Sequence, residues 1–168
     1  MTKIMNSPKL QMPLPFAYKF MEGVSFISVM VLIAIPIYYW NQLPEHVLIN
    51  GGKTAGKGIE LVVPIIGVLL YILMLIVKKI PHHFNYVVCI TEENAYFQYT
   101  LAIKLMVWVN FLSMLMFIVE CYSSIQSALS NNSNIGWWIV IGLLGVLTVV
   151  IVHFIRRMKN DGYKSITT

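Results

Sequence analysis

Four long apolar stretches limit most strongly how this chain can fold. They cover residues 24–40, 61–77, 105–119 and 135–155, and they contain no Asp, Glu, Lys or Arg. A bilayer core about 30 Å thick needs about 20 helical residues, with about 17 to 25 as the usual range. Three stretches reach that length alone, and the third reaches it when residues 100–104 are added. Each stretch is therefore predicted to be a transmembrane helix.

Composition also favours a membrane protein over a soluble one. Hydrophobic residues make up 58% of the chain and charged residues 11%, against about 45–50% and about 25% in soluble domains. We therefore predict an all-α integral membrane protein, a four-helix transmembrane bundle in a single domain of residues 1–168. Its helices are expected at about residues 20–40, 59–78, 92–121 and 135–156.

The basic residues predict how the helices are oriented. An even number of spans places both termini on one side, which then carries nine Lys and Arg residues. The other side carries two, Lys53 and Lys57, and Lys104 lies within a helix. Because cytoplasmic loops are enriched in Lys and Arg, both termini are expected in the cytoplasm (N-in/C-in). The net charge of +5 is then a property of membrane orientation, and we expect contact with the lipid bilayer and not with nucleic acid.

Polar residues on the third stretch are candidates for function. Lys104 is a full charge inside a predicted span, where ionisable groups are costly. Its long side chain can also reach the headgroups from about one turn inside the boundary, and we favour this interpretation over an interhelical partner or a transport role. Asn110, Ser113 and Glu120 recur at spacings of three and seven, so they share one helix face. We expect cross-helix hydrogen bonds from Asn110 and Ser113, with a polar cleft as the alternative.

The loop between the first two stretches is rich in glycine. It nearly matches a phosphate-binding loop through Gly51, Gly56 and Lys57, but Gly58 stands where the magnesium-binding hydroxyl would be. Nucleotide hydrolysis is therefore not expected. Amides of the glycine-rich turn, together with Lys53 and Lys57, could instead hold a lipid phosphate or an acidic peptide.

The sequence shows no catalytic or metal-binding constellation. His82 and His83 are adjacent rather than four residues apart, and the predicted topology puts His46 across the membrane from them. We therefore expect no metal and no cofactor, and we favour a binding protein over an enzyme. The candidate contacts for a partner or a lipid are Glu45, His46, Lys53, Lys57, Lys104, Asn110 and Glu120.

Local signals surround the third and fourth stretches. Residues 86–90 are expected to form a short strand or an interfacial segment. Thr91 offers an N-cap oxygen, so the third helix is expected to start directly after it and to end near Cys121, before a Ser/Asn-rich loop. On the fourth stretch, Gly142 and Gly145 leave a flat strip suited to close packing of another helix.

Short motifs between the first and third stretches resemble those of a known family. The chain has Leu-Pro at 43–44 followed by Val47, then Pro64 in the second stretch, and Ile-Thr-Glu-Glu-Asn at 90–94. With these motifs, residues 24–121 resemble the bacterial membrane family called domain of unknown function 1648. That family also forms the N-terminal part of the sporulation-delaying-protein immunity (SdpI-like) proteins.

The resemblance implies a bacterial inner-membrane protein, and some relatives are implicated in toxin immunity or in signalling with a regulator. The chain departs from the family pattern at Leu48, which replaces a proline, and at residues 50–51, where His-Phe is expected. The role of that histidine is therefore not carried over. Our leading hypothesis is recognition of a partner, either a peptide toxin or a regulatory protein. The alternative is a subunit of a small homo-oligomeric transporter or permease, with Lys104, Asn110 and Glu120 along its path.

Overall fold

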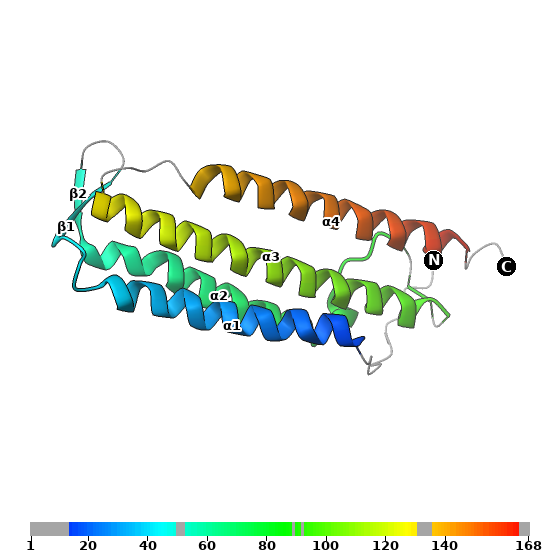
Figure 1. The fold of residues 1–168 in the computed structure, drawn as a ribbon. Coiled ribbons are helices and arrows are strands. Elements are labelled where there is room, and N and C mark those ends of the chain that lie inside the picture. Colours follow the sequence, from blue (N-terminus) through cyan, green and yellow to red (C-terminus); the bar gives the residue numbers. More distant parts are fainter. Residues whose placement is uncertain (1–13, 50–52, 89, 92, 131–135, 165–168) are drawn as a thin grey trace.

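The structure, a computed structural model, describes residues 14–49, 53–88, 90–91, 93–130 and 136–164. It is a bundle of four helices with a small hairpin at one end (Figure 1). The helices are α1 (Phe16–Tyr39), α2 (Val62–Val77), α3 (Ala95–Ser130) and α4 (Gly136–Lys164). The short elements are the strands β1 (His46–Ile49) and β2 (Lys53–Gly56) and the 3-10 helices η1 (Lys57–Leu61) and η2 (Pro81–His83).

Four helices are long and apolar enough to cross a membrane. The candidate spans are Phe16–Tyr39, Lys57–Val77, Ala95–Leu129 and Trp137–Asn160. The second span includes η1, which runs directly into α2. The prediction of a mainly helical chain with four helices of spanning length is therefore confirmed.

The central helix of the bundle is α3. Both α1 and α4 pack mainly on α3, and α2 packs on α3 and to a smaller extent on α1. In Figure 1, α4 lies on one side of α3 while α1 and α2 lie on the other. The hairpin end of the bundle has a core cluster of Leu32, Leu43, Cys121 and Ile125. The opposite end, where α1 begins and α4 ends, has a second cluster of Leu101, Ala102, Phe154 and Met158.

Two helices, α3 and α4, end later in the sequence than predicted. α3 continues from Cys121 to Ser130, because Cys121 and Ile125 are buried one turn apart against Leu43 in the hairpin-end cluster. Part of the expected Ser/Asn-rich loop is therefore helical. α4 continues beyond residue 156 to Lys164, where Met158 extends the buried stripe of the helix.

The start of α3 is capped as predicted, although the helix begins at Ala95. The Asn94 backbone N–H donates to Thr91 Oγ1 over 3.3 Å, and the Thr91 N–H donates to Asn94 Oδ1 over 2.9 Å. This reciprocal pair satisfies donors that a helix N-terminus leaves free. Of the two alternatives for residues 86–90, the strand is wrong for the described residues 86–88 and 90, which form no strand, and the interfacial segment stays a prediction. Cys89 lies outside the described residues.

The hairpin is the feature that an all-α prediction missed. β1 pairs antiparallel with β2, with His46 opposite Gly56 and Ile49 opposite Lys53. The side chain of Val47, in β1, is buried. Residues 46–49 and 53–56 of the segment between α1 and α2 therefore form a β-hairpin, and the glycine-rich turn at residues 50–52 lies outside the described part.

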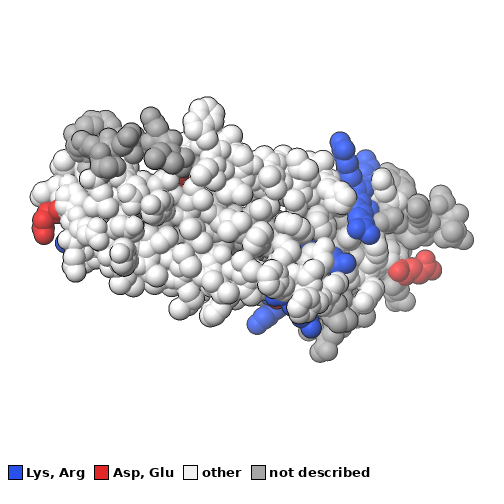
Figure 2. Space-filling view, viewed as in Figure 1, with Lys and Arg blue, Asp and Glu red and all other residues white. Residues whose placement is uncertain are grey.

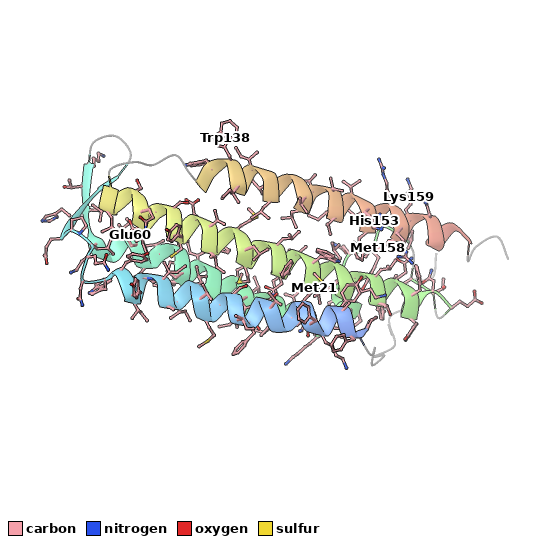
Figure 3. The ribbon with its side chains drawn as sticks, viewed as in Figure 1. Met21, Glu60, Trp138, His153, Met158 and Lys159 are labelled. Carbon is pink, nitrogen blue, oxygen red and sulfur yellow. The ribbon has the colours of Figure 1, made fainter. Side chains whose placement is uncertain are left out.

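Glycines have opposite environments in α2 and α4. A Cβ on Gly67 would lie 2.5 Å from Leu32 Cδ2 and 3.1 Å from Phe117 Cγ, so α1, α2 and α3 meet closely there. A Cβ on Gly142 or Gly145 would meet nothing within 4 Å. The prediction that these two glycines pack closely on another helix is therefore wrong within the described chain. Both glycines are exposed on α4, and Trp138, one turn before Gly142, points away from α3 in Figure 3.

Candidate functional site

Charged and aromatic residues bound an apolar band of similar length on all four helices. The two boundary residues of each helix are 16 to 18 positions apart in the sequence, a length of about 24–27 Å at about 1.5 Å per residue. The boundary pairs are Glu22 and Trp40, Glu60 and Lys78, Lys104 and Glu120, and Trp138 and Arg156. Figure 2 shows that Lys and Arg gather toward one end of the molecule. We call this the basic end; its described members are Lys19, Lys78, Lys79, Lys104, Arg156, Arg157 and Lys159.

Lys57 anchors the hairpin to the end of α1. Its Nζ lies 3.9 Å from Glu45 Oε1 and 5.2 Å from the centre of the Trp40 ring. Its backbone N–H donates to the Glu45 carbonyl oxygen over 3.1 Å. A cation over an indole ring contributes about 0.5–1 kcal/mol at an exposed site and more when desolvated. Leu43, before β1, and Val47, in β1, are both buried, so the hairpin is joined to the bundle by apolar as well as polar contacts.

The structure brings some of the predicted loop contacts together. Glu45 and Lys57 form the anchor, and His46 is exposed beside them at the base of the hairpin. Lys53 is exposed at the far end of β2, opposite Ile49. The ammonium of Lys57 is thus already engaged by a carboxylate and a ring, and this position does not favour the predicted role in binding a phosphate.

Beneath the hairpin lies Glu60, a buried carboxyl that was not among the candidate contacts. It is 5% exposed and lies in η1 at the start of the helical stretch that continues into α2 (Figure 3). A helix N-terminus favours a negative charge in its first turn. Its position at this start favours a structural role for Glu60 at the foot of the hairpin.

Three candidates on α3 do not converge. Lys104 turns toward α1, with its Nζ 5.4 Å from the centre of the Tyr18 ring. Asn110 is 6% exposed, and its Oδ1 has no hydrogen-bond partner in the described chain. Glu120 is half-buried ten residues further on and about 160° around α3 from Lys104. The expected cross-helix bond from Asn110 is therefore wrong for the described residues, and no common path joins the three side chains.

A polar cluster at the basic end was not foreseen from the sequence. Gln98 Nε2 donates to the Met158 carbonyl oxygen over 2.9 Å and so ties α3 to α4. The Tyr86 hydroxyl donates to the Pro81 carbonyl oxygen over 2.8 Å, and its ring lies 5.5 Å from that of Tyr99. Burial, and then the nearby Tyr99, raises the pKa of Tyr86 above its usual value. These contacts fix the segment before α3.

The described residues contain no group of three His, Cys, Asp or Glu side chains that could hold a metal ion. Cys121 is buried as a free thiol. No protein-family model, no curated protein and no solved structure matches this chain. The candidate site is therefore defined by the chain's own residues, and the candidate surface is the anchored hairpin with its exposed polar side chains His46 and Lys53.

Lys57→Met is expected to loosen the hairpin without unfolding the bundle. The substitution keeps the apolar stem but removes the contacts to Glu45 and Trp40, each worth about 1 kcal/mol or less. Hydrogen exchange of the β1 and β2 amides should become several-fold faster while exchange in α3 stays unchanged. Lys53→Met, at the exposed end of β2, is the control and should leave the hairpin amides protected. Equal protection in the two variants would contradict the anchoring role.

Proposed function

We propose that the chain crosses a bacterial inner membrane four times with both termini in the cytoplasm. Four helices of spanning length, an apolar band of about 24–27 Å on each, and a basic end that contains the start of α1 and the end of α4 support this orientation. Lys and Arg concentrate on the cytoplasmic side of membrane proteins. The hairpin would then lie outside the cytoplasm.

The proposed function is recognition of a partner, specifically an extended peptide outside the cytoplasm, by the hairpin. The observation that carries the proposal is that the loop after α1 is a hairpin fixed by Lys57, Glu45 and Trp40 rather than a flexible linker. The described sheet has two strands, so each strand has one edge that pairs with no other described strand. Extended peptides bind such edges by adding a strand, and a fixed edge lowers the entropy cost of binding.

The resemblance to domain of unknown function 1648 and to SdpI-like proteins remains a proposal and supports this function. It implies toxin immunity or signalling with a regulator. In the immunity form the peptide is a toxin captured at the hairpin, and this is the form that the fixed hairpin favours. The transporter alternative is not favoured by any contact described above, because Lys104, Asn110 and Glu120 lie on different sides of α3.

A proline in β2 tests the proposal. Thr54 lies opposite Leu48 in the hairpin, and Thr54→Pro removes a backbone donor and disrupts strand pairing. In a strain lacking the gene, sensitivity to envelope-active peptides is expected to rise. The wild-type chain and Thr54→Val, which keeps a β-branched residue, should restore resistance, whereas Thr54→Pro should not.

Photocrosslinking identifies which end binds the partner. A crosslinker at Lys53 should capture the added peptide, and one at Val149, exposed on the outward side of α4, should not. Unchanged sensitivity of the deletion strain would refute the immunity form. Capture of a cytosolic protein from Glu93, which is exposed at the basic end, with no capture from Lys53 would favour signalling with a regulator.

A further inference from the structure

Lys104 carries a charge that no acidic side chain in the described chain neutralises. The ion pairs formed by the described residues are those of Lys57 with Glu45 and Lys78 with Glu22. The ammonium of Lys104 lies over the Tyr18 ring, and its side chain is half-buried. A ring face attracts a cation but carries no net charge. Lys104 therefore keeps the capacity to bind an anion at the edge of the apolar band.

α4 brings two further nitrogen-bearing side chains close to Lys104 along the bundle axis, His153 at its level and Arg157 nearer the basic end. The hydrogen bond from Gln98 to Met158 fixes the register of α3 and α4, which run in opposite directions. Lys104 lies six residues from this bond on α3, and His153 lies five residues from it on α4, so their levels differ by about 1.5 Å. His153 is exposed on α4 (Figure 3), and Arg157 lies four residues later on the same face. A phosphate at Lys104 would thus have His153 at a similar level, and Arg157 about 7.5 Å nearer the basic end, from where its long side chain can reach toward Lys104.

Beyond Lys104, toward the hairpin end, the same side of α3 is apolar. Trp108 and Phe111 follow Lys104 at spacings of four and seven, and their rings meet edge to face at 6.2 Å. Both side chains are half-buried, because α1 and α4 each pack mainly on α3 and leave part of it exposed. This side of α3 therefore combines a cation at the boundary with aromatic rings inside the apolar band.

We propose that this face, formed by Lys104, Trp108 and Phe111 of α3 with His153 and Arg157 of α4, binds one anionic phospholipid. Lys104 and Arg157 donate hydrogen bonds to the phosphate oxygens, which carry the complementary charge. The acyl chains lie along Trp108 and Phe111. The rings distinguish a lipid from a free phosphate, which would gain nothing from them. The proposal rests on the membrane insertion proposed above and is independent of peptide recognition at the hairpin.

Native mass spectrometry of the full chain in detergent micelles tests the proposal. The protein is incubated with equal amounts of phosphatidylglycerol and phosphatidylcholine, and the ratio of the two lipids that stay bound is measured. The wild-type chain is expected to retain one phosphatidylglycerol in preference to phosphatidylcholine. Lys104→Met is expected to lower that preference about five-fold, the factor given by about 1 kcal/mol for a basic residue near a lipid headgroup.

Lys159→Met is the matched control. It removes the same charge from α4 near Arg157, but Lys159 is exposed about 200° around the helix from Arg157, so the lipid ratio should not change. If Lys104→Met is poorly folded by circular dichroism, Arg157→Gln, at an exposed position, replaces it and should also lower the preference. Equal ratios in Lys104→Met (or Arg157→Gln) and Lys159→Met, or equal retention of the two lipids by the wild type, would overturn the proposal. Displacement of the lipid by millimolar inorganic phosphate would instead indicate a free-phosphate site.

Discussion

Gly67→Val is expected to lower the free energy of unfolding by about 3 kcal/mol, the upper part of the range for overpacking a well-packed site. The first added atom would lie 2.5 Å from Leu32 Cδ2 and 3.1 Å from Phe117 Cγ. Leu32 has no exposed surface, so it cannot move into solvent or lipid to make room. Relief would require α2 to move away from α1 and α3, which would reduce the packing of all three helices. Thermal unfolding in detergent, followed by circular dichroism, should show a fall in the midpoint of about 10 °C.

Gly142→Val is the control for this substitution. It makes the same chemical change in another apolar helix, where a Cβ meets nothing within 4 Å. Any gain from replacing a helical glycine, about 0.5–1 kcal/mol at most, is common to both variants, so their difference isolates the packing at Gly67. Equal midpoints for the two variants would show that α2 does not pack closely on Leu32 and Phe117.

The four helices could be predicted from the sequence because each long apolar stretch specifies a helix without help from the rest of the chain. Inside a bilayer an unpaired backbone group is costly, and a helix satisfies all of its own groups. The ends of the helices could not be predicted in this way. The last turns of α3 and α4 are stabilised by tertiary packing, with Ile125 in the cluster that contains Leu43 and Met158 in the cluster that contains Leu101. Such contacts leave no local pattern in the sequence.

The hairpin left a local signal that was assigned to another structure. Asn50, Gly51 and Gly52 lie between two short runs that contain β-branched residues, a pattern typical of a β-hairpin. The same glycines, with Lys57, also resemble a phosphate-binding loop. The anchor of Lys57 on Glu45 and Trp40 depends on the strand register, so it could not be found before the hairpin itself.

The candidates on α3 show which part of a site a helical spacing can predict. The spacing placed Asn110 on a buried face, and the structure confirms that it is buried. The spacing does not say which atoms of the neighbouring helices face Asn110, and no described group bonds to Asn110 Oδ1. Lys104 contacts Tyr18, which lies 86 positions earlier in the sequence. Gln98 bonds to Met158, which lies 60 positions later. Only the packing of the helices brings these residues together.

Lys78→Met is expected to destabilise the bundle by about 2 kcal/mol, between the values typical of exposed and of buried ion pairs. Lys78 Nζ binds Glu22 Oε1 and joins the end of α2 to α1, and the side chains are 21% and 27% exposed. Removing the ammonium leaves the carboxylate without its partner at the edge of the apolar band, where an unpaired charge is costly. Unfolding in detergent with added denaturant should show a lower midpoint, and Glu22→Gln should have a similar effect.

A double-mutant cycle separates this ion pair from the other effects of the two substitutions. Glu22→Gln combined with Lys78→Met should be less destabilised than the sum of the single variants by about 1–2 kcal/mol, because the second substitution removes the unpaired partner. Lys79→Met is the matched control. It removes a neighbouring charge that is exposed and forms no ion pair among the described residues, so it should change stability by less than about 0.5 kcal/mol. If Lys78→Met and Lys79→Met were equally stable, or if the cycle gave no coupling, α1 and α2 would be held together by their apolar contacts alone.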